Sequence, residues 1–135
     1  MYDGTLPDGV EYQGSSLTLE SGTTIRHYFS GDLTNARLTV NGVVLDSGEI
    51  KKDGNRSYIE ITNIAAPDLD KAYVVSLTTY NNGNIATDFV INYSVLSYCQ
   101  RALYGEKNVD KALKDLANSI YKYWFAAENY QYKYV

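Results

Sequence analysis

The sequence has few of the residues that cross-link or interrupt a small fold. Its 135 residues include one Cys and two Pro, and both prolines, Pro7 and Pro67, lie outside the strands we expect. Because Cys99 is alone, an intrachain disulfide and a multi-cysteine metal site are excluded. A chain of this length buries about two-thirds of its unfolded surface without such cross-links. We therefore expect one domain with a single core.

An excess of positive charge and long apolar runs are also missing. The chain carries 12 Lys and Arg against 16 Asp and Glu, which gives a formal net charge of −4. It lacks the cationic excess that neutralises a phosphate backbone, so nucleic acid is not an expected partner. No apolar stretch reaches the ~18 residues of a membrane-spanning helix, and the start Met1–Gly4 has neither region of a signal peptide. We expect no membrane insertion.

Up to about Tyr93 the apolar residues tend to alternate with polar ones, and β-branched and aromatic residues are frequent. A period of two is typical of half-buried strands. The expected strands are Leu17–Glu20, Thr24–Phe29, Arg37–Asn41, Val43–Ile50 with an interruption, Ser57–Thr62, Tyr73–Tyr80 and Ile85–Tyr93. The dipeptides Asn41-Gly42, Asp53-Gly54 and Asn82-Gly83 accept positive φ and predict tight hairpin turns.

After Tyr93 the apolar spacing changes from two to about 3.6, which indicates helices. Ser94 is the expected N-cap of a first helix that ends near Gly105. A second helix is expected to start near Asn108, and its apolar stripe runs through Val109, Ala112, Leu113, Leu116, Ala117, Ile120, Trp124 and Ala127. Two helices cannot bury such stripes alone, so we expect them to dock on the strands.

Together these patterns predict a mainly β chain with a C-terminal α part. Residues 14–93 are expected to form an immunoglobulin-like antiparallel β-sandwich, because the strands are short and closely spaced. Residues 94–135 are expected to form a docked helical hairpin and tail, which makes 14–135 a single domain. Residues 1–13 contain Pro, Gly and Asp and are interpreted as a linker or frayed terminus.

The sequence offers one histidine and one cysteine as candidate catalytic groups. Alternation places His27 on the same face as Ile25 and Phe29, so we interpret it as a packed side chain. Cys99 lies on the apolar side of the first helix and is interpreted as a small buried hydrophobe, since a reactive thiol needs an exposed, electropositive setting. Nothing in their spacing supports a Cys–His pair.

Asp68 and Asp70 could supply oxygen ligands to calcium or act as an acid and a base. The sequence around them has no EF-hand spacing, and glycosidase chemistry needs carboxyl groups on both sides of a cleft. Loop solvation and turn capping are therefore the favoured interpretation. The run Asn81-Asn82-Gly83-Asn84 is likewise interpreted as a hairpin tip. We expect no catalytic residue, no metal and no cofactor.

Tyrosine is the abundant aromatic residue, with 14 Tyr against 3 Phe and 1 Trp. A Tyr or Trp ring offers a flat apolar face with a polar edge, which suits sugar rings and partner surfaces as well as core boundaries. Trp124 is expected to pack between helix and sheet, with a ligand platform as the alternative. The segment Tyr130-Gln131-Tyr132-Lys133-Tyr134 has a period of two and predicts an extended tail with three tyrosines on one side. Trp124, Tyr130, Tyr132 and Tyr134 are the candidate ligand-binding residues.

Two segments carry a resemblance to a known module. Ile64-Ala65-Ala66-Pro67-Asp68-Leu69-Asp70, followed by Tyr93-Ser94-Val95-Leu96-Ser97-Tyr98-Cys99, resembles a module at the C-terminal end of secreted and surface-attached multimodular proteins of gut Firmicutes. The resemblance continues through Leu113, Leu116, Ala117, Ile120, Tyr123, Ala126, Ala127 and Tyr130, and covers about half the chain. One departure is Trp124, which stands where that pattern usually has Gly.

The resemblance implies an extracellular or cell-surface location, with neighbouring modules of the same polypeptide as partners. We therefore expect a non-catalytic structural or accessory module. The alternative is a carbohydrate-binding module in which Tyr and Trp stack on the sugars of a polysaccharide; a cell-surface protein is a further possible partner. A hydrolase would need convergent titratable groups that the sequence does not indicate.

Overall fold

The computed structural model describes residues 2–18, 22–100 and 111–134, without the side chains of residues 112, 113 and 127–134. By backbone proximity the chain forms two compact units. The sandwich unit comprises Met1–Asn63 with Tyr73–Asn92, and the helical unit comprises Ile64–Ala72 with Tyr93–Val135. Residues 64–72, which the sequence analysis places within the sandwich, thus group with the helices.

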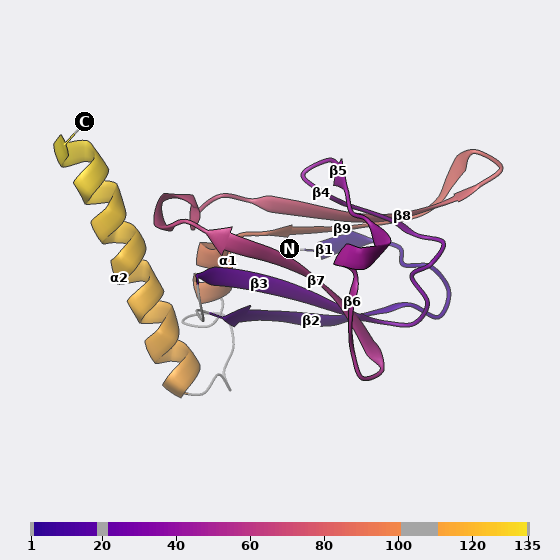
Figure 1. Ribbon diagram of the computed structural model, residues 1–135, viewed down its shortest axis with the longest axis horizontal. Coiled ribbons are helices and arrows are strands. Elements are labelled where there is room, and N and C mark those ends of the chain that lie inside the picture. The colour runs from indigo at the N-terminus through magenta and orange to yellow at the C-terminus, as the bar shows by residue number, and fades with distance from the viewer. Residues whose placement is uncertain (1, 19–21, 101–110, 135) are drawn as a thin grey trace. The chain divides into compact units, whose positions relative to one another are not determined.

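Antiparallel strands build the sandwich unit (Figure 1). The strands are β1 (Tyr2–Gly4), β2 (Glu11–Thr18), β3 (Thr23–Ser30), β4 (Arg37–Val40), β5 (Val43–Val44), β6 (Lys51–Asp53), β7 (Arg56–Ile64), β8 (Tyr73–Asn81) and β9 (Asn84–Tyr93). One sheet has the order β2-β3-β7-β6 and the other the order β1-β9-β8-β4-β5. Strands β2 to β9 therefore take the places of A, B, C, C′, D, E, F and G of an immunoglobulin-like sandwich. The expected fold class, mainly β with a C-terminal helical part, is confirmed.

The N-terminal segment is where the sequence-based prediction is wrong. Residues 1–13 were expected as a linker or frayed terminus, but β1 pairs with β9 from Tyr2↔Ile91 to Gly4↔Phe89 and β2 begins at Glu11. β2 lies at the edge of its sheet, and its sequence EYQGSSLT does not alternate. Its pairing with β3 shifts register between Tyr12 and Ser15. The expected strand Leu17–Glu20 overlaps β2 only at Leu17 and Thr18. Backbone hydrogen bonds to a neighbouring strand do not require a side-chain period, so the pattern missed β1 and most of β2.

Two of the three expected turns have the expected geometry. Asn41-Gly42 joins β4 to β5 and Asn82-Gly83 joins β8 to β9, with φ positive at all four residues. This is the type I′ arrangement that matches the twist of a hairpin. The third turn lies one residue later than expected, because Asp53 pairs with Arg56 and leaves Gly54-Asn55 as the turn.

The expected strand Val43–Ile50 is mostly not a strand. β5 ends at Val44, and a short 3-10 helix, η1 (Ser47–Glu49), follows with Asp46 as its N-cap. The following strand, β6, pairs with β7 and was not expected. Asp46 and Glu49 form a reciprocal capping box, which favours a helical turn over the extended conformation here.

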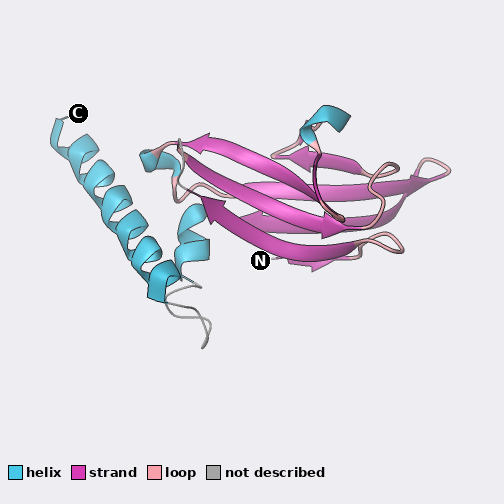
Figure 2. Ribbon diagram, turned by 60° about the horizontal axis from the view of Figure 1, so that its bottom comes forward, coloured by secondary structure: helices cyan, strands magenta, loops and turns pink. Residues whose placement is uncertain are grey.

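The core of the sandwich unit lies between its two sheets (Figure 2). Ile25, His27 and Phe29 of β3 are fully buried, while the residues between them are half-buried. Strands β7, β8 and β9 add Ile59, Ile61, Val75, Leu77, Phe89 and Ile91. Phe29 and Phe89 meet from opposite sheets with ring centroids 6.5 Å apart. The strict alternation in β3 therefore separates a core face from an outer face.

The helical unit contains the 3-10 helix η2 (Ala66–Asp68) and the helices α1 (Val95–Gln100) and α2 (Lys111–Tyr134). The Ser97 backbone N–H donates to Ser94 Oγ at 3.0 Å, which confirms Ser94 as the N-cap of α1. The Leu96 N–H donates to the Leu69 carbonyl at 3.0 Å, and α2 contacts both α1 and η2. The expected helix end at Gly105 and cap at Asn108 lie outside the described residues. No helix in the described parts of the chain is long and apolar enough to span a membrane.

The C-terminal segment is helical where an extended tail was expected. α2 continues to Tyr134, because residues 111–134 contain no Pro or Gly to end the helix. Successive helical positions are about 100° apart around the axis, so positions 130, 132 and 134 do not share one side. The prediction of three tyrosines on one face is therefore wrong, and their side chains lie outside the described ones.

Candidate functional site

The outer face of the β2-β3-β7-β6 sheet carries a row of stacked arginines and tyrosines. Arg26 and Tyr28 come from β3, and Arg56 and Tyr58 come from β7. The Arg26 guanidinium carbon lies 4.7 Å from the Tyr58 ring centroid, and that of Arg56 lies 4.3 Å from the Tyr28 centroid. The two rings are 5.5 Å apart. We call these four residues the Arg–Tyr ladder.

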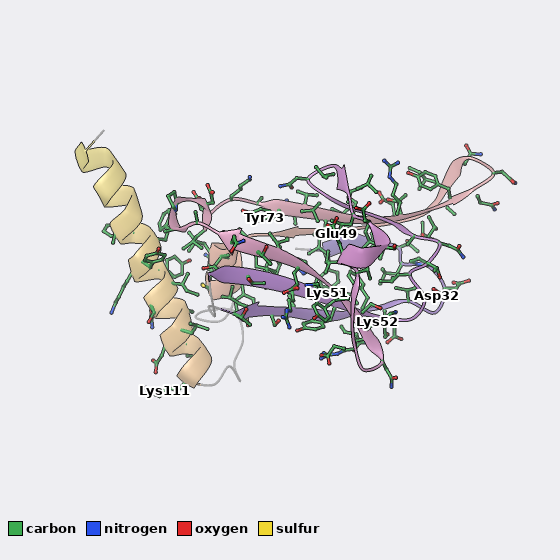
Figure 3. All side chains as sticks on the ribbon, viewed as in Figure 1. Asp32, Glu49, Lys51, Lys52, Tyr73 and Lys111 are labelled. Carbon is green, nitrogen blue, oxygen red and sulfur yellow. The ribbon has the colours of Figure 1, made fainter. Side chains whose placement is uncertain are left out.

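A carboxylate and a lysine extend the ladder on one side. Glu60 Oε2 accepts a hydrogen bond from Arg26 Nε at 3.1 Å, and Glu60 Oε1 accepts one from Lys51 Nζ at 2.6 Å. Only 14% of the Glu60 side chain is exposed, against 35% of Arg26 and 53% of Lys51. The carboxylate therefore lies below two cations that reach solvent. Figure 3 labels Lys51 on β6.

The electrostatics favour the charged forms of Glu60, Lys51 and Arg26 near neutral pH. The hydrogen bond from Lys51, and then that from Arg26, hold the pKa of Glu60 below its usual value. The same contact with Glu60 raises the pKa of Lys51, and hydrogen bonding to Tyr28 and Glu60 raises that of Arg26. A hydrogen bond to Ser16, assisted by the nearby arginines, lowers the pKa of Tyr28.

At the other end of the ladder, Arg56 Nη2 donates to Asp53 Oδ2 at 3.0 Å across the β6–β7 turn. Both side chains are about half exposed, so this ion pair contributes little to stability. The ladder itself stabilises the sheet through cross-strand pairs and cation–π contacts, each worth roughly 0.5–1 kcal/mol at exposed sites. Chemically, it presents guanidinium N–H groups held at fixed positions by the rings beneath them.

Sequence analysis missed this site, although the signal was present. Alternation that directs Ile25, His27 and Phe29 inward directs Arg26 and Tyr28 outward. The same rule applied to the Ser57–Thr62 strand directs Tyr58 and Glu60 outward. What the pattern could not show is that β3 and β7 are neighbours, which brings residues 34 positions apart into contact.

The only histidine lies on the opposite, buried side of the same strand. His27 is fully buried, and its Nδ1 is 2.6 Å from Ser15 Oγ, which is also hydrogen-bonded to the Tyr12 hydroxyl. Burial lowers the pKa of His27 to about 4, so its ring is neutral at physiological pH. The interpretation as a packed side chain is confirmed.

Cys99 is also fully buried, in α1 of the helical unit. Burial raises the pKa of its thiol to about 11, so the reactive thiolate is scarce at neutral pH. It forms no disulfide within the described parts of the chain. The residue behaves as the small buried hydrophobe that the sequence indicated.

The remaining candidates do not form a cluster. Asp68 is the last residue of η2 and Asp70 lies two residues beyond it, and both are exposed. Within residues 2–18, 22–100 and 111–134 no three His, Cys, Asp or Glu side chains converge to hold a metal ion. A shallow depression of ≈ 320 Å³ lies along the β1–β9 pair, lined by Tyr2, Asp3, Gly4, Asp88, Val90 and Asn92.

Trp124 is partly buried on α2, on the side of the helix that also contains the buried Ala117 and Ile120. Its indole Nε1 is buried and has no hydrogen-bond partner among the described residues. Tyr123 and Phe125, by contrast, are 61% and 63% exposed. Trp124 thus lies partly in the packed stripe of α2. The exposed aromatic residues beside it, Tyr123 and Phe125, were not among the ligand-binding residues predicted from the sequence.

Comparison with known proteins identifies no relative. No protein-family model matches the chain, and no curated protein or solved structure is significantly similar to it. The resemblance to a module of gut Firmicutes proteins therefore stays a prediction, and function must be argued from the residues.

Proposed function

We propose that this chain is a non-catalytic structural or accessory module of an extracellular, multimodular bacterial protein. The observation that carries the proposal is the placement of its only histidine and only cysteine. Both side chains are fully buried, one in the sandwich core and one in the helical unit. Burial shifts their pKa values to about 4 and about 11, away from the range in which a general base or a thiolate nucleophile works.

The paired charged residues on the outer face of the β2-β3-β7-β6 sheet make structural contacts that suit such a module. Glu60, the least exposed of the paired carboxylates, is held by two cations on the outer face of a sheet. A carboxylate with a lowered pKa in that setting stabilises strand pairing and is a poor proton donor at neutral pH. The extracellular setting and the neighbouring modules rest on the resemblance of residues 64–70 and 93–99.

The proposal is tested by a substrate screen together with thiol labelling on the full chain. We expect no turnover of chromogenic glycosides or esters, and alkylation of Cys99 by iodoacetamide only after denaturant is added. Turnover that co-purifies with the protein and is lost in His27→Gln or Asp68→Asn, while Asp70→Asn retains it, would contradict the proposal. Rapid alkylation of Cys99 in the native protein would contradict its burial.

A further inference from the structure

We propose that the Arg–Tyr ladder, together with Lys51, binds a linear anionic polysaccharide whose sugars carry carboxylate or sulfate groups. This inference rests on the proposed non-catalytic role and names its ligand class. It concerns residues of β3, β6 and β7, and not the candidate ligand-binding residues of α2, Trp124, Tyr130, Tyr132 and Tyr134.

The first argument is the charge of this face. Arg26, Lys51 and Arg56 expose 35%, 53% and 45% of their side chains, whereas Glu60 exposes 14%. The outermost layer is therefore cationic, and among the ion pairs of the described residues on this face Asp53 is the well-exposed carboxylate. The whole chain, by contrast, has a net charge of −4. A local positive surface on an acidic protein favours an anionic ligand at this face over the rest of the molecule.

The second argument is the fixed orientation of the guanidinium groups. Each lies within 5 Å of a tyrosine centroid, and the rings themselves are in contact, so the side chains are held over the sheet. Arg26 donates through Nε to Glu60 and is also hydrogen-bonded to Tyr28, and Arg56 uses Nη2 for Asp53, out of five N–H donors on each group. A planar group with further N–H donors can bind a carboxylate or sulfate in a bidentate way. Fixing it in advance lowers the entropy cost of binding.

The third argument separates a polysaccharide from other polyanions and from neutral glycans. Double-stranded DNA presents one charge per ~1.7 Å, and its binding needs many phosphate contacts that three cations on an acidic protein do not supply. A polyuronate carries one carboxylate per sugar, which suits cations separated by tyrosine rings. Neutral sugars would need open aromatic faces, but one face of each ladder ring is covered by a guanidinium group.

The test is affinity electrophoresis of the full chain in gels that contain polygalacturonate, dextran sulfate or unsubstituted dextran. We expect retardation by both anionic polymers, no retardation by dextran, and weaker retardation as NaCl is added. Equal retardation by dextran, or equal retardation by double-stranded DNA at the same charge concentration, would overturn the proposal.

The variants are matched in net charge. Arg26→Gln with Arg56→Gln should weaken binding at least fivefold, while Arg37→Gln with Lys111→Gln, on β4 and α2, should leave it within twofold. Both pairs remove two positive charges, so a net-charge effect would weaken both equally and would overturn the assignment to this face. Arg26→Lys with Arg56→Lys keeps the charge but loses the planar fork, and we expect a clear loss; unchanged binding would contradict the bidentate mode.

Melting temperatures of all variants show whether each pair remains folded. If the variant Arg26→Gln with Arg56→Gln is unfolded, the retardation of Lys51→Gln is compared with that of Lys111→Gln. This pair also removes equal charge and leaves the stacked rings in place. Absence of polymer binding together with absence of turnover would overturn this inference alone. Turnover in the substrate screen would instead overturn the proposed function, so the two failures are distinguishable.

Discussion

The Ser15 hydroxyl lies 2.6 Å from Nδ1 of His27, and the two residues face each other across the β2–β3 pair. The ring lies inside the core, where burial keeps it in its neutral form. Because burial lowers the pKa of His27 to about 4, the protonated ring is disfavoured in the folded chain alone. The stability of the fold is therefore linked to pH through His27.

We predict that the free energy of unfolding falls as the pH drops from about 6.5 to 4. In that window the unfolded chain binds a proton at His27 and the folded chain does not, so acid favours unfolding. This loss of unfolding free energy is small above pH 6.5, amounts to about 2 kcal/mol at pH 5, and reaches about 3 kcal/mol below pH 4. Urea unfolding at pH 7 and pH 5 measures it.

The control is His27→Leu, in which the loss between pH 7 and pH 5 should disappear. Glu60 also loses its stabilising contacts on protonation, but its pKa is lowered from 4.5, so its effect lies at lower pH. An NMR titration of the His27 ring gives the same pKa directly. A midpoint near 6.5, or an equal pH dependence in His27→Leu, would contradict the burial argument.

The N-cap of α1 provides a second prediction. Ser94→Ala should destabilise the chain by about 1 kcal/mol, because the Ser97 N–H loses its acceptor at the helix start, while Ser94→Gly should cost only a few tenths. Ser119→Ala, at an exposed position within α2, is the control and should stay within about 0.5 kcal/mol. Equal effects of Ser94→Ala and Ser119→Ala would show that the cap does not stabilise α1.

On α2 the two faces should respond differently to truncation. Ile120 is 3% exposed, so Ile120→Ala should cost about 2–5 kcal/mol through lost burial and the cavity left behind. Tyr123 is 61% exposed, and Tyr123→Ala should change stability by about 0.5 kcal/mol or less. Thermal unfolding of both variants measures the contrast. A larger effect for Tyr123→Ala would mean that the apolar stripe is assigned to the wrong side.

Two glycines with positive φ should differ because of their surroundings. A Cβ at Gly31 would lie 2.1 Å from the Gly9 carbonyl oxygen, whereas a Cβ at Gly54 would meet nothing within 4 Å. Gly54→Ala should therefore cost about 1–2 kcal/mol from backbone strain alone. Gly31→Ala should cost clearly more, because two backbone segments must move apart. Similar melting temperatures for the two variants would contradict the close approach at Gly31.

Local patterns were sufficient for several elements of the fold. The alternation around Ile25 and Phe29 assigned strand β3 and its buried face. Asn41-Gly42 and Asn82-Gly83 predicted two hairpins, since few other dipeptides accept positive φ at both central positions. Ser94 predicted a helix start, because its hydroxyl competes for an otherwise unpaired backbone N–H. Each of these features depends on residues close in sequence.

By itself, the sequence determined the β-then-α order, the buried places of His27 and Cys99, and the buried face of β3, because these follow from side-chain period and composition. The tertiary structure decided that β1 and the first part of β2 are strands, since their backbone groups are satisfied by β9 and β3 whatever their side chains. It also decided that Arg26 lies over Tyr58. Neighbouring strands are chosen by packing of the whole core, so no local pattern contains that contact.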